Sequence, residues 1–219
     1  MAIELERDFV RKYTKGPDVF EFGCGNGLFA KELSSSYSVE AVDLFAPETT
    51  EGFKFTQSDV LDMNIDKKFN TVVAVSSLEH CGIETGQCDN PDYDCIARVS
   101  RVLSDMALDR IIITAPFGNK LLFTQKEGPD DVYENIASPE WGYRQLTHSK
   151  IMELFKDFTL VEHVTYMYIP QPNEGDFFNV DNWAAIDWEA HKETFDPGVL
   201  ATVANHTKIG CYMLERNSQ

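Results

Sequence analysis

VFEFGCGNGLF, residues 19–29, places three glycines at alternate positions directly after a short apolar run. Glycine loses more conformational freedom on folding than any other residue, so this cluster indicates a backbone that turns sharply or is closely approached. An apolar strand, a glycine turn and a helix start together form a site for a nucleotide-like ligand, because the first turn of a helix has unpaired N–H groups. A tight turn without any ligand is the alternative.

The spacing of these glycines argues against one ligand class. A dinucleotide turn has the pattern G-x-G-x-x-G. In this chain the glycines are Gly23, Gly25 and Gly27, and Leu28 stands where the third glycine of a NAD turn would be. A nicotinamide oxidoreductase is therefore disfavoured.

Apolar segments alternate with helical patterns on both sides of this stretch. Helices are expected at residues 4–13, 28–33, 94–103 and 147–155, and strands at 19–22, 39–42, 53–56, 71–75, 110–115, 159–169 and 206–215. Nearly continuous apolar strands between helices predict an α/β fold with a parallel sheet covered on both faces. The last two strands predict an antiparallel edge. We expect a single domain over residues 1–219, with an N-terminal helix within 1–16 and an insertion or lid at 170–205.

The amino-acid composition argues against some classes of binding partner. The 219 residues include 36 Asp and Glu against 19 Lys and Arg, a net charge of −17. Because that charge repels phosphates and anionic headgroups, neither nucleic acid nor a membrane surface is expected as a partner. Five cysteines, a charged N-terminus and no long apolar run predict a reduced cytoplasmic protein. We expect a monomer or homodimer.

Polar residues follow the predicted strands where each one ends. Asp43 ends the second strand, Asp59 follows the third, and Ser76 follows the fourth. The carboxyl ends of parallel strands are where open α/β sheets bind ligands. Asp43 is suited to both hydroxyls of a ribose, and Asp59 to an exocyclic adenine amine. A helix N-cap is the alternative for Asp59.

These motifs, in this order, resemble those of class I S-adenosylmethionine-dependent methyltransferases. The matching segments are Glu21-x-Gly23-Cys24-Gly25-Asn26-Gly27, Asp43, Ser58-Asp59, and FNTVV at 69–73 through LEH at 78–80. The resemblance implies a doubly wound, seven-stranded Rossmann-like sheet of order 3-2-1-4-5-7-6 with strand 7 antiparallel, and S-adenosyl-L-methionine as cofactor. It also implies a set of cofactor-binding residues: Glu21, Gly23, Gly25, Asp43, Leu44, Asp59, Val60 and Ser76.

A fainter resemblance concerns the acceptor. SSLEHCGI at 76–83, an acidic loop after it, and Arg98-x-x-Arg101 resemble methyltransferases that modify sugars or polysaccharides. This implies methyl transfer to a hydroxyl of a sugar or polysaccharide precursor. A small-molecule N-methyltransferase and a non-catalytic S-adenosylmethionine-binding module are the alternatives.

An oxygen nucleophile must lose its proton, which calls for a general base. His80, just past the fourth strand, is the leading candidate, and the neighbouring Glu79 is the alternative base. Anchoring of a loop or of the helix with Arg98 and Arg101 is the structural alternative for Glu79. A structural role in packing is the alternative for His80.

Residues from the last third of the chain are expected to bind the acceptor. They are Tyr143, Arg144, His148 and Trp183, with further aromatics at Phe177, Phe178 and Trp188. Aromatic faces stack on sugar rings, although burial under a long loop explains the aromatic residues equally well. A divalent ion on Asp89, Asp92 and Asp94 is not favoured, because their spacing is not that of a calcium loop. No metal ligands are therefore assigned.

Overall fold

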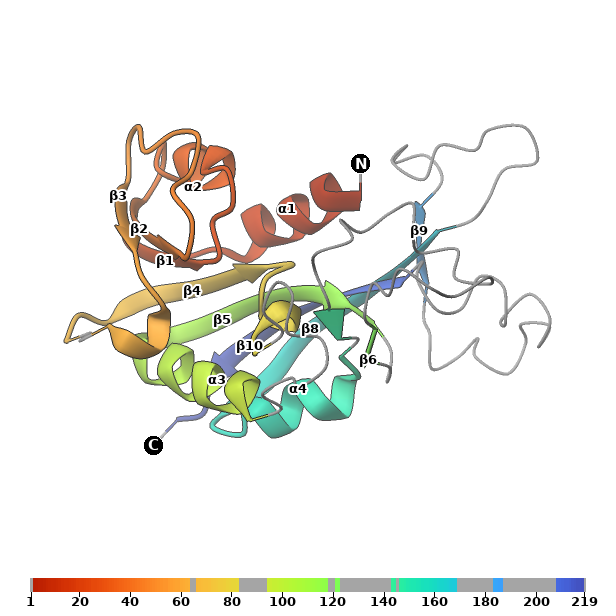
Figure 1. Ribbon diagram of the computed structural model, residues 1–219. Helices are drawn as coiled ribbons and strands as arrows, with labels where there is room; N and C mark the ends of the chain where they lie inside the picture. The colour runs from red at the N-terminus through yellow and green to blue at the C-terminus, as the bar shows by residue number, and fades with distance from the viewer. Residues whose placement is uncertain are drawn as a thin grey trace, which may run out of the picture.

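The computed structural model describes residues 2–63, 66–82, 94–117, 121–122, 143–144, 146–168, 183–186 and 208–218. Its centre is an eight-stranded sheet in the order β3-β2-β1-β4-β5-β10-β8-β9 (Figure 1). The strands are β1 (Asp18–Phe22), β2 (Ser38–Asp43), β3 (Lys54–Gln57), β4 (Phe69–Val75), β5 (Ala107–Pro116), β8 (Phe158–Tyr168), β9 (Trp183–Ile186) and β10 (Lys208–Arg216).

The strand directions confirm the predicted topology. β1 to β5 run parallel, and β10 is antiparallel to both of its neighbours, β5 and β8. With β8 as sixth strand and β10 as seventh, the order is 3-2-1-4-5-7-6. β9 adds an eighth strand, antiparallel to β8, that the sequence pattern did not reveal. The lid at 170–205 otherwise lies mostly outside the described residues and stays a prediction.

Helices cover both faces of the sheet. α1 (Ala2–Tyr13) and α2 (Leu28–Leu33) lie on one face, and α3 (Cys95–Met106) and α4 (His148–Leu154) on the other (Figure 1). Each face has its own hydrophobic core. Phe9 and Val10 of α1 pack with Val73 of β4 on the first face, while Ile151 of α4 packs with Ile113 of β5 on the second.

Burial on both faces explains the sequence of the central strands. Six of the seven residues of β4, FNTVVAV, are buried, as is the run from Arg110 to Ala115 in β5. A strand covered on both sides has no solvent face, so it reads as a continuous apolar run. None of the described helices is long and apolar enough to cross a bilayer.

Short elements follow the strands at the carboxyl edge. η1 (Val60–Asp62) follows β3, and η2 (Leu78–His80) follows β4. A small second sheet pairs β6 (Leu121–Leu122) with β7 (Tyr143–Arg144). β7 lies beside η2, so a distant part of the chain returns to the end of β4.

Candidate functional site

The turn after β1 is built from glycines in the left-handed conformation. Gly23, Gly25 and Gly27 have φ of 72°, 55° and 78°. A Cβ on Gly23 would lie 2.4 Å from Ser77 Oγ, and one on Gly27 only 2.3 Å from the Thr49 carbonyl oxygen. At Gly25 no atom lies within 4 Å of such a Cβ. Packing therefore explains two of the glycines, whereas Gly25 exposes its backbone to open space that a ligand can enter.

Asp43 joins the end of β2 to this turn. Its Oδ2 accepts a hydrogen bond from the Gly25 N–H at 2.8 Å, and its Oδ1 accepts one from the Phe45 N–H at 3.0 Å. The Asp43 carbonyl accepts from the Ser58 N–H at 3.0 Å, which links the ends of β2 and β3. The structure thus brings Asp43 directly against Gly25, two residues that the sequence assigned to one site.

Asp59 has the geometry of a helix N-cap, which was the alternative to adenine binding. It is the N-cap of η1, and its Oδ1 accepts from the Leu61 N–H at 2.9 Å. Val60, next in the chain, buries its side chain in the core, so only its backbone is open to a ligand. Leu44 is 56% exposed, and its carbonyl accepts from the Gln57 side-chain amide at 3.1 Å. An adenine-binding role for these residues stays a prediction.

The exit from β4 touches the glycine turn. Ser77 Oγ donates to the Gly23 carbonyl at 3.1 Å and to the Val75 carbonyl at 2.7 Å. Ser76 has a φ of 43°, and it is the one non-glycine residue with positive φ in the described ranges. Its Oγ donates to Glu6 Oε2 of α1 at 2.6 Å.

The two candidate catalytic residues differ in exposure. The Glu79 side chain is only 2% exposed, and burial raises its pKa well above the ordinary value, with the nearby Glu6 charge adding to the rise. The His80 side chain is 34% exposed, and its Nε2 lies 3.9 Å from Glu79 Oε1, too far for a hydrogen bond. His80 is therefore the more accessible of the two to a substrate.

The residues predicted to bind the acceptor come from three different elements. Tyr143 and Arg144 form β7, beside η2. His148 begins α4, where its exposed ring lies 5.5 Å from that of His163. Trp183 is in β9, opposite Tyr168 at the edge of the sheet. Asp89, Asp92, Phe177, Phe178 and Trp188 lie outside the described residues.

No group of three or more His, Cys, Asp or Glu side chains suited to a metal ion occurs within the described ranges. Of the three loop carboxylates considered, Asp94 alone belongs to those ranges, and it is exposed at the start of α3.

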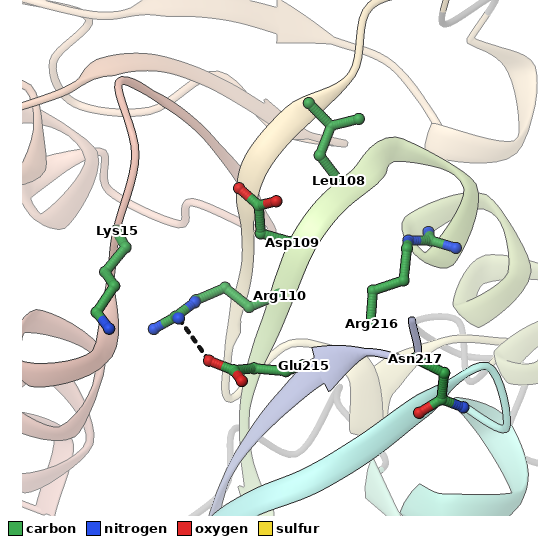
Figure 2. Close-up of a pocket in the computed structure, with 7 residues that line it drawn as sticks. All are labelled: Lys15, Leu108, Asp109, Arg110, Glu215, Arg216 and Asn217. Carbon is green, nitrogen blue, oxygen red and sulfur yellow. Dashed lines mark hydrogen bonds and ion pairs between the residues drawn. The ribbon is translucent and has the colours of Figure 1, made fainter. Parts of the chain in front are cut away.

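A pocket of about 530 Å³ lies at the opposite edge of the sheet, where β5 begins and β10 ends (Figure 2). Figure 2 shows Arg110 directed at Glu215, and this ion pair measures 2.6 Å. Arg110 also donates to the Tyr13 carbonyl, and Arg216 donates to the Ala107 carbonyl. Because both guanidinium groups already donate hydrogen bonds to other residues of the protein, we assign this pocket a structural role.

Glu21 is a buried acid at the end of β1. Its side chain is 2% exposed, and Oε2 has no hydrogen-bond partner within the described part of the chain. Burial raises its pKa to about 8; the positive charge of Arg7 opposes the rise and the negative charge of Asp43 adds to it. An unpaired buried carboxyl beside the glycine turn favours a cationic or hydrogen-bond-donating ligand group.

This pKa predicts a pH-dependent stability. A group whose pKa is higher in the folded state stabilises fully below its unfolded pKa and loses that contribution as pH rises through its folded pKa. Glu21 therefore lowers the free energy of unfolding between about pH 4.5 and about pH 8, by at most about 1.4 kcal/mol per pH unit. In urea titrations across this range, the free energy of unfolding of Glu21→Gln should fall less steeply with pH than that of the unaltered protein. Parallel profiles would contradict the prediction.

The sequence analysis assigned no individual role to Glu6, Ser77 or Thr114. Glu6 had a detectable signal, because it precedes Phe9 and Val10 by three and four residues and so shares their face of the helix. An acid on the apolar face of a helix needs a partner in the core. Thr114 had no comparable signal inside an apolar strand.

The chain matches no family model and no curated protein. Solved structures do share its fold. The 1,6-didemethyltoxoflavin-N1-methyltransferase of Burkholderia thailandensis, with bound S-adenosylhomocysteine, is 14% identical, with a TM-score of 0.61 over 99% of this chain and 79% of that one. The N-methyltransferase NodS of Bradyrhizobium japonicum is 11% identical, with a TM-score of 0.56 over 99% and 98%.

One neighbour has a different activity in its name. The cyclase SpnF is 10% identical, with a TM-score of 0.57 over 100% of this chain and 82% of that one. Identities this low show a shared fold, which confirms the methyltransferase-like architecture. Since a fold hosts several functions, the activity must be argued from the site.

Proposed function

We propose that this protein is an S-adenosylmethionine-dependent methyltransferase that transfers a methyl group to a hydroxyl of a sugar or polysaccharide precursor. One observation carries the cofactor assignment: Gly25 is left-handed, its Cβ position is open, and its N–H is bound to Asp43. A bare backbone beside a carboxylate, at the carboxyl ends of adjacent parallel strands, suits an adenosyl group. Fold neighbours with bound S-adenosylhomocysteine support this assignment.

The residues present fit the parts of the cofactor. Asp43 would hold the ribose hydroxyls, with Leu44 beside it, and Asp59 with the Val60 amide would hold the adenine. Gly23 and Gly25 would lie under the methionine part, whose amine would donate to the Ser76 carbonyl. Glu21, buried and unpaired at Oε2 in the described structure, would supply an acceptor oxygen for that amine, whose positive charge would favour the ionised form of the carboxyl.

The cofactor supplies an activated methyl group on a sulfonium. The chain then has to place an acceptor oxygen in line with it and exclude water, and such positioning provides much of the rate. His80 would accept the proton of the acceptor hydroxyl, since it lies at the end of β4 and reaches solvent. The acceptor would be bound by β7, the start of α4 and β9, through Tyr143, Arg144, His148 and Trp183.

A nitrogen acceptor is the second candidate. Three of the fold neighbours are named as N-methyltransferases, those of 1,6-didemethyltoxoflavin and of coclaurine and NodS, and this favours a nitrogen acceptor. An amine can attack without a base, so the two candidates differ in what they require of His80. A binding module that transfers no methyl is the third. Small-molecule or glycan substrates, no resident metal, and a monomer or homodimer remain part of the proposal.

Thermal denaturation with two ligands tests the cofactor. At 100 times its Kd, S-adenosylhomocysteine should raise Tm by about 5–10 °C, because ligand binding to the folded state stabilises it. NAD at the same concentration should leave Tm unchanged. Stabilisation by NAD alone would overturn the assignment. A screen of sugars, nucleotide sugars and amines with methyl-labelled cofactor, read by mass, then identifies the acceptor class.

A further inference from the structure

We propose that Glu6, on the N-terminal helix α1, is a positioning residue for the cofactor site, because it holds Ser76 in the conformation that binding uses. This inference rests on the function proposed above, in which the Ser76 carbonyl receives the amine of the cofactor. Neither the glycine turn nor the strand ends suggested any part for α1, and Glu6 is 70 residues from Ser76 in sequence. The contacts of Ser76 and Glu6 carry the argument.

Ser76 needs external support. Its φ of 43° lies in the left-handed region, which serine adopts only when the surrounding structure imposes it. The Ser76 N–H donates to the Thr114 carbonyl at 3.0 Å and to Thr114 Oγ1 at 3.1 Å. Its hydroxyl donates to Glu6 Oε2 at 2.6 Å. Ser76 is thus held from β5 on one side and from α1 on the other.

The burial and the hydrogen bonds of Glu6 suit this role. Its side chain is 2% exposed, and the hydroxyls of Ser76 and Thr114 both donate to Oε2. A carboxyl buried this deeply is costly unless such hydrogen bonds satisfy it. The same two contacts therefore satisfy Glu6 and join α1 to the ends of β4 and β5.

The conformation of Ser76 also affects the glycine turn. Ser77, the next residue, donates its hydroxyl to the Gly23 carbonyl at 3.1 Å. If Ser76 rotated to a common right-handed φ, the peptide between Ser76 and Ser77 would swing and disturb that bond. Through Ser76, Glu6 thus controls two backbone segments that face the proposed cofactor. Docking of α1 and cofactor binding are then coupled, and coupling between sites is reciprocal.

A double-mutant cycle in the Kd of S-adenosylhomocysteine, measured by calorimetry on the full chain, tests this. Glu6→Ala and Ser76→Ala should each weaken binding about tenfold, and the double variant should be no weaker than either, because they remove one interaction. Glu6→Gln should bind within about twofold of the unaltered protein, since its amide oxygen can accept from both hydroxyls. Rescue by glutamine separates positioning by Glu6 from an effect of its charge.

Glu4→Ala is the matched control on the same helix. The Glu4 side chain is 45% exposed and pairs with Arg7 and Arg11. Its removal perturbs α1 without touching Ser76, so Kd should not change. A Tm recorded for every variant separates loss of stability from loss of affinity.

The outcomes distinguish a failure of this inference from a failure of the proposed function. If the unaltered protein does not bind S-adenosylhomocysteine, the proposed function fails. If it binds and Glu6→Ala binds equally well, or the two single effects add, the positioning role is wrong. Should Glu6→Ala not fold, hydrogen exchange of the unaltered protein decides: the ligand should slow amide exchange in residues 2–13. Unchanged exchange there overturns the inference.

Discussion

Gly25→Asn is expected to lose S-adenosylhomocysteine affinity by on the order of 100-fold, about 2.8 kcal/mol, while the protein stays folded. Asparagine tolerates left-handed φ better than other residues with a side chain, so strain at the φ of 55° is small. Its side chain would meet no protein atom within 4 Å at Cβ. The added atoms would instead occupy the space into which we place the cofactor. Calorimetric titration measures the loss, and Tm should change by less than about 4 °C.

Gly27→Ala is the matched control in the same turn. Its φ is 78°, and the added Cβ would lie 2.3 Å from the Thr49 carbonyl oxygen, a backbone atom that cannot move freely. We expect the free energy of unfolding to fall by about 2–3 kcal/mol, because overpacking and left-handed strain add. Gly25→Asn should thus lose ligand binding, whereas Gly27→Ala should lose stability. Full affinity in Gly25→Asn would mean that the open space at Gly25 is not the cofactor site.

The sequence predicted those parts of the site that depend on local geometry. Three glycines after an apolar strand predict a backbone turn, because glycine adopts turn conformations without a steric penalty, and Asp43 ends beside that turn because β1 and β2 are adjacent and parallel. The carboxyl-edge location of Ser76 and His80 followed from the same rule. Periodicity predicted the parallel sheet and its antiparallel edge, whereas the strand order came from the resemblance to class I methyltransferases.

The remaining features depend on contacts between distant segments. Glu6 lies 70 residues from Ser76 in sequence, and nothing local to either residue encodes their hydrogen bond. Strand β9 is four residues long within a segment of mixed composition, and it is defined by pairing with β8. The acceptor residues were chosen for their chemistry alone. The sequence pattern placed His148 in the first turn of a helix, as the structure has it, but not its contact with His163 of β8.

His80→Ala is expected to lower kcat by about 10²–10⁴-fold with a hydroxyl acceptor, the usual contribution of a general base. The cofactor contacts argued above involve Gly25, Asp43 and Ser76, so the Kd of S-adenosylhomocysteine should not change. Single-turnover rates with saturating cofactor measure the effect on the chemical step. Added imidazole should restore part of the rate, since the side chain that is removed is 34% exposed and its place is open to solvent.

Glu79→Gln is the comparison that separates the two catalytic candidates. With 2% exposure, Glu79 cannot reach an acceptor without a change in structure, so its substitution should lower kcat far less than loss of His80. A larger loss in Glu79→Gln would make Glu79 the base or the group that orients it. An unchanged rate in His80→Ala would remove His80 from the chemistry. With a confirmed amine acceptor, that same unchanged rate is the result that N-methyl transfer requires, because a neutral amine attacks the methyl group without a base.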